Sequence, residues 1–208
     1  MVIDPREISY KERYKIMIGT VVPRPIAFVS TVSADGIPNL APFSYFTAIA
    51  AEPPTLCFAP GRRAVDGERK DTLSNIEATG EFVVNVVTEE IGPAMNATAV
   101  DFPPEIDEFE VAKLTPLPSH VVRPPRVKES PVNMECKLHQ IVPIGRPQAG
   151  GAALVIGEIV MFHVADNLYE EGRINIHELK PLGRLAGTEY TTLGRIISIE
   201  RGSNQPKK

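Results

Sequence analysis

The 208-residue sequence contains only two cysteines, Cys57 and Cys136, which lie far apart in apolar or strand-like segments. Free cysteine packs as a small hydrophobic side chain, so we expect two buried thiols and no disulfide. The chain also lacks any apolar run near the roughly 18 to 20 residues that span a membrane. Its first five residues show none of the zones of a signal peptide. We therefore expect a cytoplasmic protein.

Tryptophan is absent, and the 22 Lys and Arg residues are outnumbered by 26 Asp and Glu, for a net charge of −4. Both features argue against a nucleic-acid binder, including a small barrel that stacks single-stranded bases. The four histidines are not paired with Cys or carboxylate at the spacing of metal ligands, so no metal site is predicted. Neither Gly-x-Gly-x-x-Gly nor a P-loop occurs, which excludes the common nucleotide-binding loops.

Proline, in contrast, is abundant: the chain has 20. Proline interrupts long helices and suits short strands joined by fixed turns. The local patterns predict a helix at 5–19 that stops at Gly19, a helix at 72–79, and strands at 21–32, 39–49, 55–58, 82–87, 132–142 and 153–164.

These elements predict one domain, residues 1–202, that is mainly β with a few short helices. Strands and helices do not alternate, which favours an antiparallel barrel, closed or partly closed, over a doubly wound sheet. The proline-rich segment 99–130 has little periodicity and is predicted to be an insertion or a lid. Residues 203–208 are predicted to form a disordered tail.

The most informative stretch is 70–76, Lys-Asp-Thr-Leu-Ser-Asn-Ile, which follows a basic loop containing Arg62 and Arg63. A helix that begins here directs unpaired N–H groups and a partial positive charge outward. Together with Lys70 and one of the two arginines, it would form an anion site, most simply for a phosphate. The alternative is an ordinary helix capped by Asp71 or Thr72, with solvated basic neighbours.

Five segments in order resemble the flavin reductase-like family of FMN-binding split-barrel proteins. They are Arg-Pro-Ile-Ala-Phe-Val-Ser-Thr at 24–31, Asn-Leu-Ala-Pro-Phe-Ser-Tyr-Phe at 39–46, Arg-Lys-Asp-Thr-Leu-Ser-Asn-Ile at 69–76, Gly-Glu-Phe-Val-Val-Asn at 80–85, and Pro-Leu-Gly-Arg-Leu-Ala-Gly-Thr-Glu-Tyr at 181–190. The resemblance implies a six-stranded Greek-key barrel, a homodimer, and FMN in a groove at the dimer interface.

The resemblance also assigns cofactor-binding residues. Residues 39–46 would run along the isoalloxazine ring, with Ala41, Pro42, Phe43 and Ser44 closest to it. Ser30, Thr31 and the stretch 62–72 would flank the phosphate, through Arg62, Lys70, Asp71 and Thr72. Asn85 is polar within an apolar strand, where it needs a partner, so it is either a flavin contact or a core amide that bridges backbone groups.

The implied reaction is hydride transfer from a reduced nicotinamide to FMN, followed by electron delivery to an acceptor such as a flavin-using partner enzyme. The flavin carries this chemistry, and no catalytic side chain is predicted. Many relatives have a Gly-Asp-His segment that helps to place the nicotinamide, but here residues 148–152 are Gln-Ala-Gly-Gly-Ala. His163, Arg184 and Tyr190 are the alternative substrate contacts. A non-enzymatic electron carrier or flavin store is the competing hypothesis.

Overall fold

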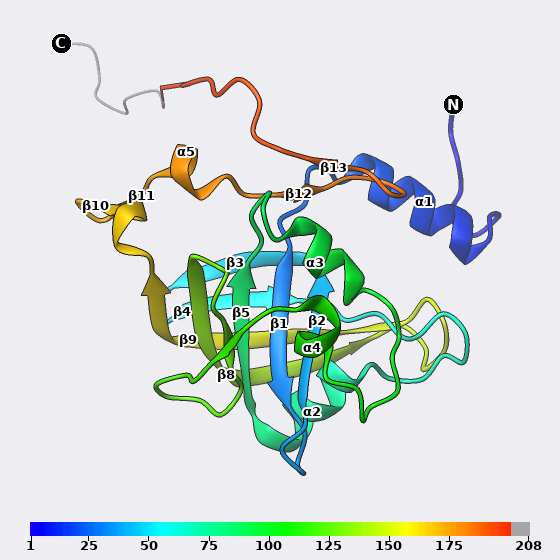
Figure 1. The fold of residues 1–208 in the computed structure, drawn as a ribbon. Helices are drawn as coiled ribbons and strands as arrows, with labels where there is room; N and C mark the ends of the chain where they lie inside the picture. The colour runs from blue at the N-terminus through cyan, green and yellow to red at the C-terminus, as the bar shows by residue number, and fades with distance from the viewer. Residues whose placement is uncertain (201–208) are drawn as a thin grey trace.

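An antiparallel sheet of seven strands forms the centre of the structure, a computed structural model that describes residues 1–200 (Figure 1). The strand order is β2-β1-β5-β8-β9-β4-β3. The strands are β1 (Ala27–Val32), β2 (Pro38–Phe43), β3 (Phe46–Ala51), β4 (Pro54–Phe58), β5 (Glu81–Val86), β8 (Val132–Ile144) and β9 (Ala152–Val164). The chain is therefore mainly β with short helices, as predicted. The expected tail at 203–208 lies outside the described residues.

β2 and β3 follow each other in the chain but lie at opposite edges of the sheet. Only Ser44 and Tyr45 separate them, so the segment 38–51 passes from one edge to the other and closes the curled sheet into a barrel. The sheet has one strand more than the six implied by the resemblance, because the single strand expected at 39–49 is divided at this bend. No helix within residues 1–200 has the length and hydropathy needed to cross a bilayer.

The barrel interior is filled by one face of each long strand. Phe43, Phe58 and Phe82 form its aromatic centre, with ring centroids 5.3 Å apart for Phe43–Phe58 and 5.5 Å for Phe58–Phe82. Such tilted and edge-on contacts suit aromatic quadrupoles. Cys136 is a buried free thiol in this core, as predicted, whereas Cys57 is a free thiol that is only partly buried.

A second core lies on the outer face of β1, β2 and β5. Phe28 and Leu40 point outward there and pack with Phe109 and Val127 from the segment 99–130. This segment carries α4 (Glu108–Ala112) and the small hairpin β6 (Pro116–Leu117) and β7 (Arg126–Val127), and it follows α3 (Gly92–Ala97). Because β1 is covered on both faces, its residues are buried almost without alternation. The segment therefore packs against the outside of the sheet.

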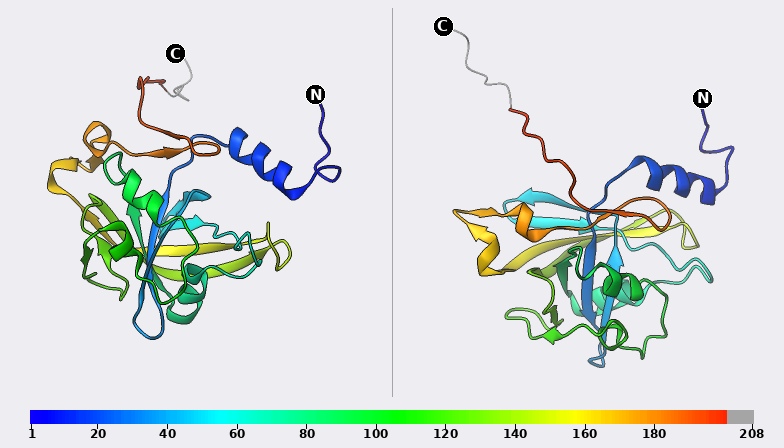
Figure 2. Two further views of the ribbon diagram at one scale, coloured as in Figure 1. Left: turned by 45° about the vertical axis from the view of Figure 1, so that its right-hand side comes forward. Right: turned by 45° about the horizontal axis from the view of Figure 1, so that its top comes forward.

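The first helix, α1 (Tyr10–Thr20), projects from the barrel in all three views (Figures 1 and 2). It begins at a capping box formed by Ser9 and Glu12, five residues later than predicted. It also continues through Gly19 instead of stopping there. Its last turn receives hydrogen bonds from the buried Arg24 side chain, which donates to the carbonyls of Ile18 and Val21 at 2.8 and 2.6 Å.

The chain after β9 leaves the barrel and runs across one end of it. It contains a 3₁₀ turn (Asp166–Leu168), β10 (Tyr169–Glu170), β11 (Arg173–Ile174), α5 (Ile176–Leu179), β12 (Gly183–Arg184) and β13 (Tyr190–Thr191). Arg24 donates to the carbonyl of Leu185 at 2.8 Å, so one buried guanidinium joins this segment to the end of α1.

Gly157 on β9 provides a test of the barrel packing. A Cβ atom at this position would overlap the ring of Phe82, which is fully buried. We expect Gly157→Ala to lower the free energy of unfolding by about 1–3 kcal/mol, the usual cost of overpacking a core. Gly194→Ala is the control, because a Cβ there meets no atom within 4 Å. Urea denaturation that gives equal stabilities for the two variants would contradict this packing.

Candidate functional site

The helix α2 (Asp71–Thr79) begins with Lys70 as its N-cap residue, and no side chain of the described part of the chain caps it. Asp71 and Thr72 lie inside the first turn and cannot be its N-cap. The alternative prediction, an ordinary helix capped by Asp71 or Thr72, is therefore wrong. Their side chains are held elsewhere, Asp71 by Arg63 and Thr72 by Asn39. The start of α2 is therefore free of side-chain acceptors for its N–H groups, which is the arrangement that favours a bound anion.

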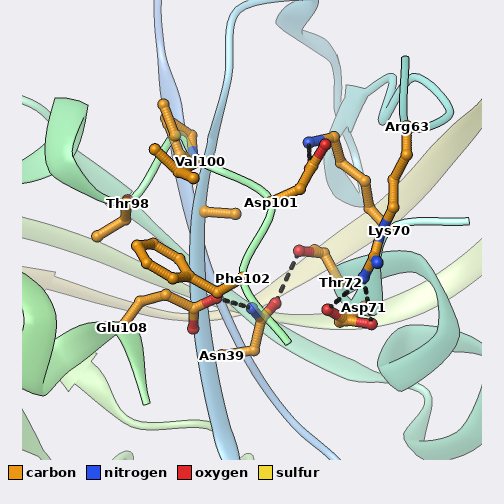
Figure 3. Close-up of a pocket in the computed structure, with 13 residues that line it drawn as sticks. Asn39, Arg63, Lys70, Asp71, Thr72, Thr98, Val100, Asp101, Phe102 and Glu108 are labelled. Carbon is orange, nitrogen blue, oxygen red and sulfur yellow. Dashed lines mark hydrogen bonds and ion pairs between the residues drawn. The ribbon is translucent and has the colours of Figure 1, made fainter. Parts of the chain in front are cut away.

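A pocket opens at this helix start, between α2, β2 and the residues that follow α3 (Figure 3). Its cations are Lys70 and Arg63. Lys70 Nζ lies 2.6 Å from Asp101 Oδ1, and Arg63 Nη2 contacts both carboxylate oxygens of Asp71 at 3.1 and 2.9 Å. The Nε atom of Arg63 is buried and has no hydrogen-bond partner within residues 1–200. A buried donor without a protein partner is costly, so this N–H needs an acceptor from outside the protein, either water or a bound group.

Asn39 on β2 forms the floor of the pocket and connects its walls (Figure 3). Its Oδ1 accepts hydrogen bonds from the hydroxyls of Thr72 at 2.8 Å and Thr31 at 3.3 Å. Its amide nitrogen donates to Glu108 Oε1 at 2.8 Å. One buried amide therefore ties β2 to β1, α2 and α4. Thr31 and Thr72 are both buried; Thr72 lines the pocket, whereas Thr31 is not among the lining residues and contacts Asn39 from β1.

Glu108 on α4 is a buried carboxyl at the edge of the pocket. Burial raises the pKa of the Glu108 carboxyl, although hydrogen bonds from the Leu40 N–H and the Asn39 amide favour its charged form. The rest of this wall is the stretch 98–102, whose Asp101 holds Lys70. Segment 99–130 thus supplies part of the pocket as well as the cover of the outer face.

The structure brings some of the predicted cofactor-binding residues to this pocket and leaves others apart. Lining it are Ala41, Pro42, Lys70, Asp71 and Thr72. Arg62 is absent from the lining and donates to the carbonyl of Gly67 at 3.0 Å, while its neighbour Arg63 takes the place in the pocket wall.

Ser30 and Asn85 lie on the outer face of the sheet, beneath the strand β7. Asn85 donates to the Phe28 carbonyl at 2.9 Å and accepts from the Val127 N–H and the Asn133 amide, both at 2.9 Å. Ser30 donates to the Pro125 carbonyl. Of the two roles predicted for Asn85, these contacts match the core amide that bridges backbone groups. Its hydrogen bonds hold segment 99–130 against the sheet.

Two other predicted cofactor residues lie at the bend between β2 and β3. Phe43 is in the barrel core, 6% exposed, so its ring is occupied by packing. The Ser44 hydroxyl accepts a hydrogen bond of 3.3 Å from Nε of Arg24. Arg24 is 5% exposed and forms no ion pair with a described residue; its other partners are backbone carbonyls. Ser44 is therefore fixed by a buried positive charge.

His163, a predicted substrate contact, is paired with a buried carboxylate. Its Nε2 lies 2.6 Å from Glu135 Oε1, and its ring meets that of His120 edge-on at 4.7 Å. Glu135 also accepts the N–H groups of residues 120, 121 and 122 at 2.7, 2.6 and 3.1 Å. Burial alone would raise the pKa of the Glu135 carboxyl, but these hydrogen bonds outweigh it and the pKa lies below its usual value. The cluster anchors the 120–122 loop to β8.

Arg184 and Tyr190, the other predicted substrate contacts, form a pair across the hairpin of β12 and β13. The guanidinium lies 4.4 Å from the centroid of the Tyr190 ring, and the Tyr190 hydroxyl donates to Asn96 on α3 at 2.9 Å. Nη1 of Arg184 is buried without a partner within residues 1–200. Neither residue lines the pocket at α2.

The sequence patterns did not identify three parts of the pocket: the floor residue Asn39 as a hub, the buried Glu108, and the Lys70–Asp101 pair. Asn39 stands in a quoted motif, but nothing local indicates its three partners. Asp101 and Glu108 belong to a segment without periodicity, and their roles depend on contacts 31 and 69 residues away in the chain.

Comparison with known proteins identifies the class. The model of the flavin reductase like domain matches residues 18–183, so the chain belongs to the flavin reductase-like family. A split barrel domain protein from Shewanella frigidimarina has the same fold, with a TM-score of 0.82 at 23% identity, covering 97% of this chain and 100% of that one. The barrel described above is therefore the split barrel of this family.

Two solved structures are more similar in sequence. Nitrilotriacetate monooxygenase component B from Bacillus cereus is 44% identical, with a TM-score of 0.91, and the match covers 96% of this chain and 98% of that one. The 2-nitrobenzoate 2-nitroreductase NbaA from Pseudomonas fluorescens is 31% identical, with a TM-score of 0.86, covering 100% and 99%.

The Glu135 cluster makes a prediction about acid stability. Folding lowers the pKa of the Glu135 carboxyl. Its charged form therefore stabilises the fold at pH values above the unfolded pKa of about 4.3, and this stabilisation is lost as the pH falls through the folded pKa. We expect Glu135→Gln to cost about 2–4 kcal/mol at pH 7, since an amide cannot accept all four hydrogen bonds. The cost should shrink as the pH is lowered toward 3. Glu158→Gln, at an exposed position of β9, is the control. Denaturation curves that give a pH-independent cost would contradict the assignment.

Proposed function

We propose that this chain is a cytoplasmic, flavin-dependent oxidoreductase that binds FMN by its phosphate in the pocket at the start of α2. The observation that carries the proposal is the set of donors at this pocket: a helix start without a side-chain cap, the Lys70 ammonium, and a buried Arg63 Nε that has no partner among residues 1–200. This is the chemistry that recognises a phosphate. Family membership supplies the flavin as the molecule that carries it.

The residues next to the pocket fit the rest of such a ligand. Ala41 and Pro42 of β2 line the pocket with small or ring-closed side chains, so a planar group can approach the backbone of β2. Just after β2, in the bend that leads to β3, Ser44 is held by the buried guanidinium of Arg24. A buried positive charge stabilises negative charge that develops nearby, so Arg24 would favour the reduced, anionic form of a ring placed beside Ser44.

Bound FMN would supply hydride and electron transfer, and the protein would orient the ring and exclude competing reactions. We propose a reduced nicotinamide as the electron donor. The similarity to a monooxygenase component and to a nitroreductase supports an acceptor that differs among relatives, such as a partner oxygenase or a small aromatic molecule. Arg184 and Tyr190 remain our candidates for contacting a donor or acceptor.

We further propose a homodimer. Apolar side chains are exposed on α1, on β3 and on the chain after β13, including Tyr14, Met17, Ile49, Ile196 and Ile197. Both α1 and the chain after β13 project from the same end of the barrel (Figure 2). Exposed apolar surface on projecting arms is typical of a surface that a second copy covers.

Replacing Lys70 tests the phosphate site. We expect Lys70→Ala to weaken FMN binding by about 10- to 100-fold, the value of one charge-assisted hydrogen bond, and to leave riboflavin binding unchanged. Riboflavin is the matched ligand because it lacks only the phosphate. Lys137→Ala, at an exposed position of β8, is the control variant. Titration calorimetry that shows equal FMN affinities for Lys70→Ala and the wild type would remove Lys70 from the site.

Anaerobic mixing with NADH or NADPH separates an enzyme from a carrier. A reductase should lose the yellow absorbance of its bound FMN within seconds, because hydride transfer bleaches the ring. We expect bleaching by at least one of the two nicotinamides in a stopped-flow spectrometer. Bleaching by neither, with dithionite still reducing the bound flavin, would contradict the reductase and support the electron carrier or flavin store.

A further inference from the structure

The ion pair between Lys70 and Asp101 joins two walls of the pocket. Lys70 is the N-cap residue of α2, and Asp101 lies in the stretch 98–102 that follows α3. The two side chains are 27% and 34% exposed, so both remain accessible from the pocket. Among the described residues, Lys70 is the only hydrogen-bond partner of the Asp101 carboxylate. Figure 3 shows this pair across the pocket from Asn39 and Thr72.

Taken together, the charged side chains that line the pocket oppose the binding of an anion. Two cations, Arg63 and Lys70, face three carboxylates, Asp71, Asp101 and Glu108, which leaves a formal charge of −1. Asp71 is bound to Arg63 through both oxygens, and Glu108 is fixed by Asn39 and the Leu40 N–H. Asp101 differs from these two because a single ion pair holds it. It is therefore the carboxylate that an incoming anion can displace at least cost.

We infer that Asp101 is a built-in competitor for the phosphate of the flavin and so sets how tightly, and for how long, a phosphorylated flavin is held. The inference rests on the proposed function, since it assumes that the anion at Lys70 is the flavin phosphate. In the empty pocket Asp101 neutralises Lys70. When the phosphate binds, Lys70 forms an ion pair with the phosphate in place of its ion pair with Asp101. The Asp101 carboxylate then lies beside a second negative charge.

Two consequences follow from this exchange. First, the flavin phosphate contributes less affinity than its donors alone would give, because part of that energy separates Lys70 from Asp101 and opposes like charges. Second, the Lys70–Asp101 ion pair can form again as the phosphate leaves, so the flavin is released faster than it would be without Asp101. A reductase that passes its reduced flavin to another protein gains from such release, whereas a permanent flavoprotein does not.

The test compares FMN and riboflavin binding to the wild type and to Asp101→Asn. Asparagine keeps the size of the side chain and removes its charge. We expect the variant to bind FMN about five- to tenfold more tightly and to release it correspondingly more slowly, as a lost like-charge contact at a partly exposed site predicts. Riboflavin affinity should not change. Fluorescence titration gives the affinities, and stopped-flow displacement gives the release rates.

Asp166→Asn, at an exposed position outside the pocket, is the matched control and should leave both affinities unchanged. If the wild type binds FMN and Asp101→Asn binds it equally or more weakly, the competitor role is overturned and only this inference fails. Weaker binding would mean that Asp101 positions Lys70 for the phosphate. If the wild type binds neither flavin, the proposed function is overturned together with the role of Asp101.

Discussion

The pocket depends on the side-chain amide of Asn39. This buried amide accepts hydrogen bonds from the hydroxyls of Thr72 and Thr31 and donates one to the Glu108 carboxyl. The elements β2, β1, α2 and α4 therefore meet at one residue. A buried amide that lost these partners would leave several polar groups unsatisfied, which is costly in a low-dielectric interior. The start of α2 is thereby fixed against β2, with Lys70 and Arg63 beside it. The floor of the pocket is thus held to both neighbouring walls by three side-chain hydrogen bonds.

The segment 99–130 covers the outer face of the sheet and also forms one wall of the pocket, and both roles depend on how it packs against the sheet. Its apolar side chains, including Phe109 and Val127, cover the outer face of the sheet, and Asn85 and Glu135 hold its backbone in place. This anchoring fixes where the segment begins, and its first residues then form one wall of the pocket. The carboxylates of Asp101 and Glu108 are therefore brought to the pocket by a segment that packs on the outer face of the sheet.

The sequence predicted the mainly β architecture, and it placed β8, β9 and the helix α2 within two residues; the strand expected at 21–32, however, begins only at Ala27. Those elements follow from local signals, namely β-rich runs, prolines and a glycine stop at Gly80. The division of 39–49 into two strands was not predicted, because barrel closure at Ser44 is a long-range event. The choice of Arg63 over Arg62 likewise depends on how the loop folds back onto Gly67. Asp101 and Glu108 carry no local signal, since their partners are distant in the chain.

We propose that the flavin phosphate binds where Lys70, Arg63 and the start of α2 converge. A crystal structure of the protein with FMN would locate the phosphate. We expect a phosphate oxygen within about 3 Å of Lys70 Nζ, with the Lys70–Asp101 ion pair broken. A phosphate bound elsewhere, with that ion pair intact and Arg63 Nε still without a partner, would contradict it.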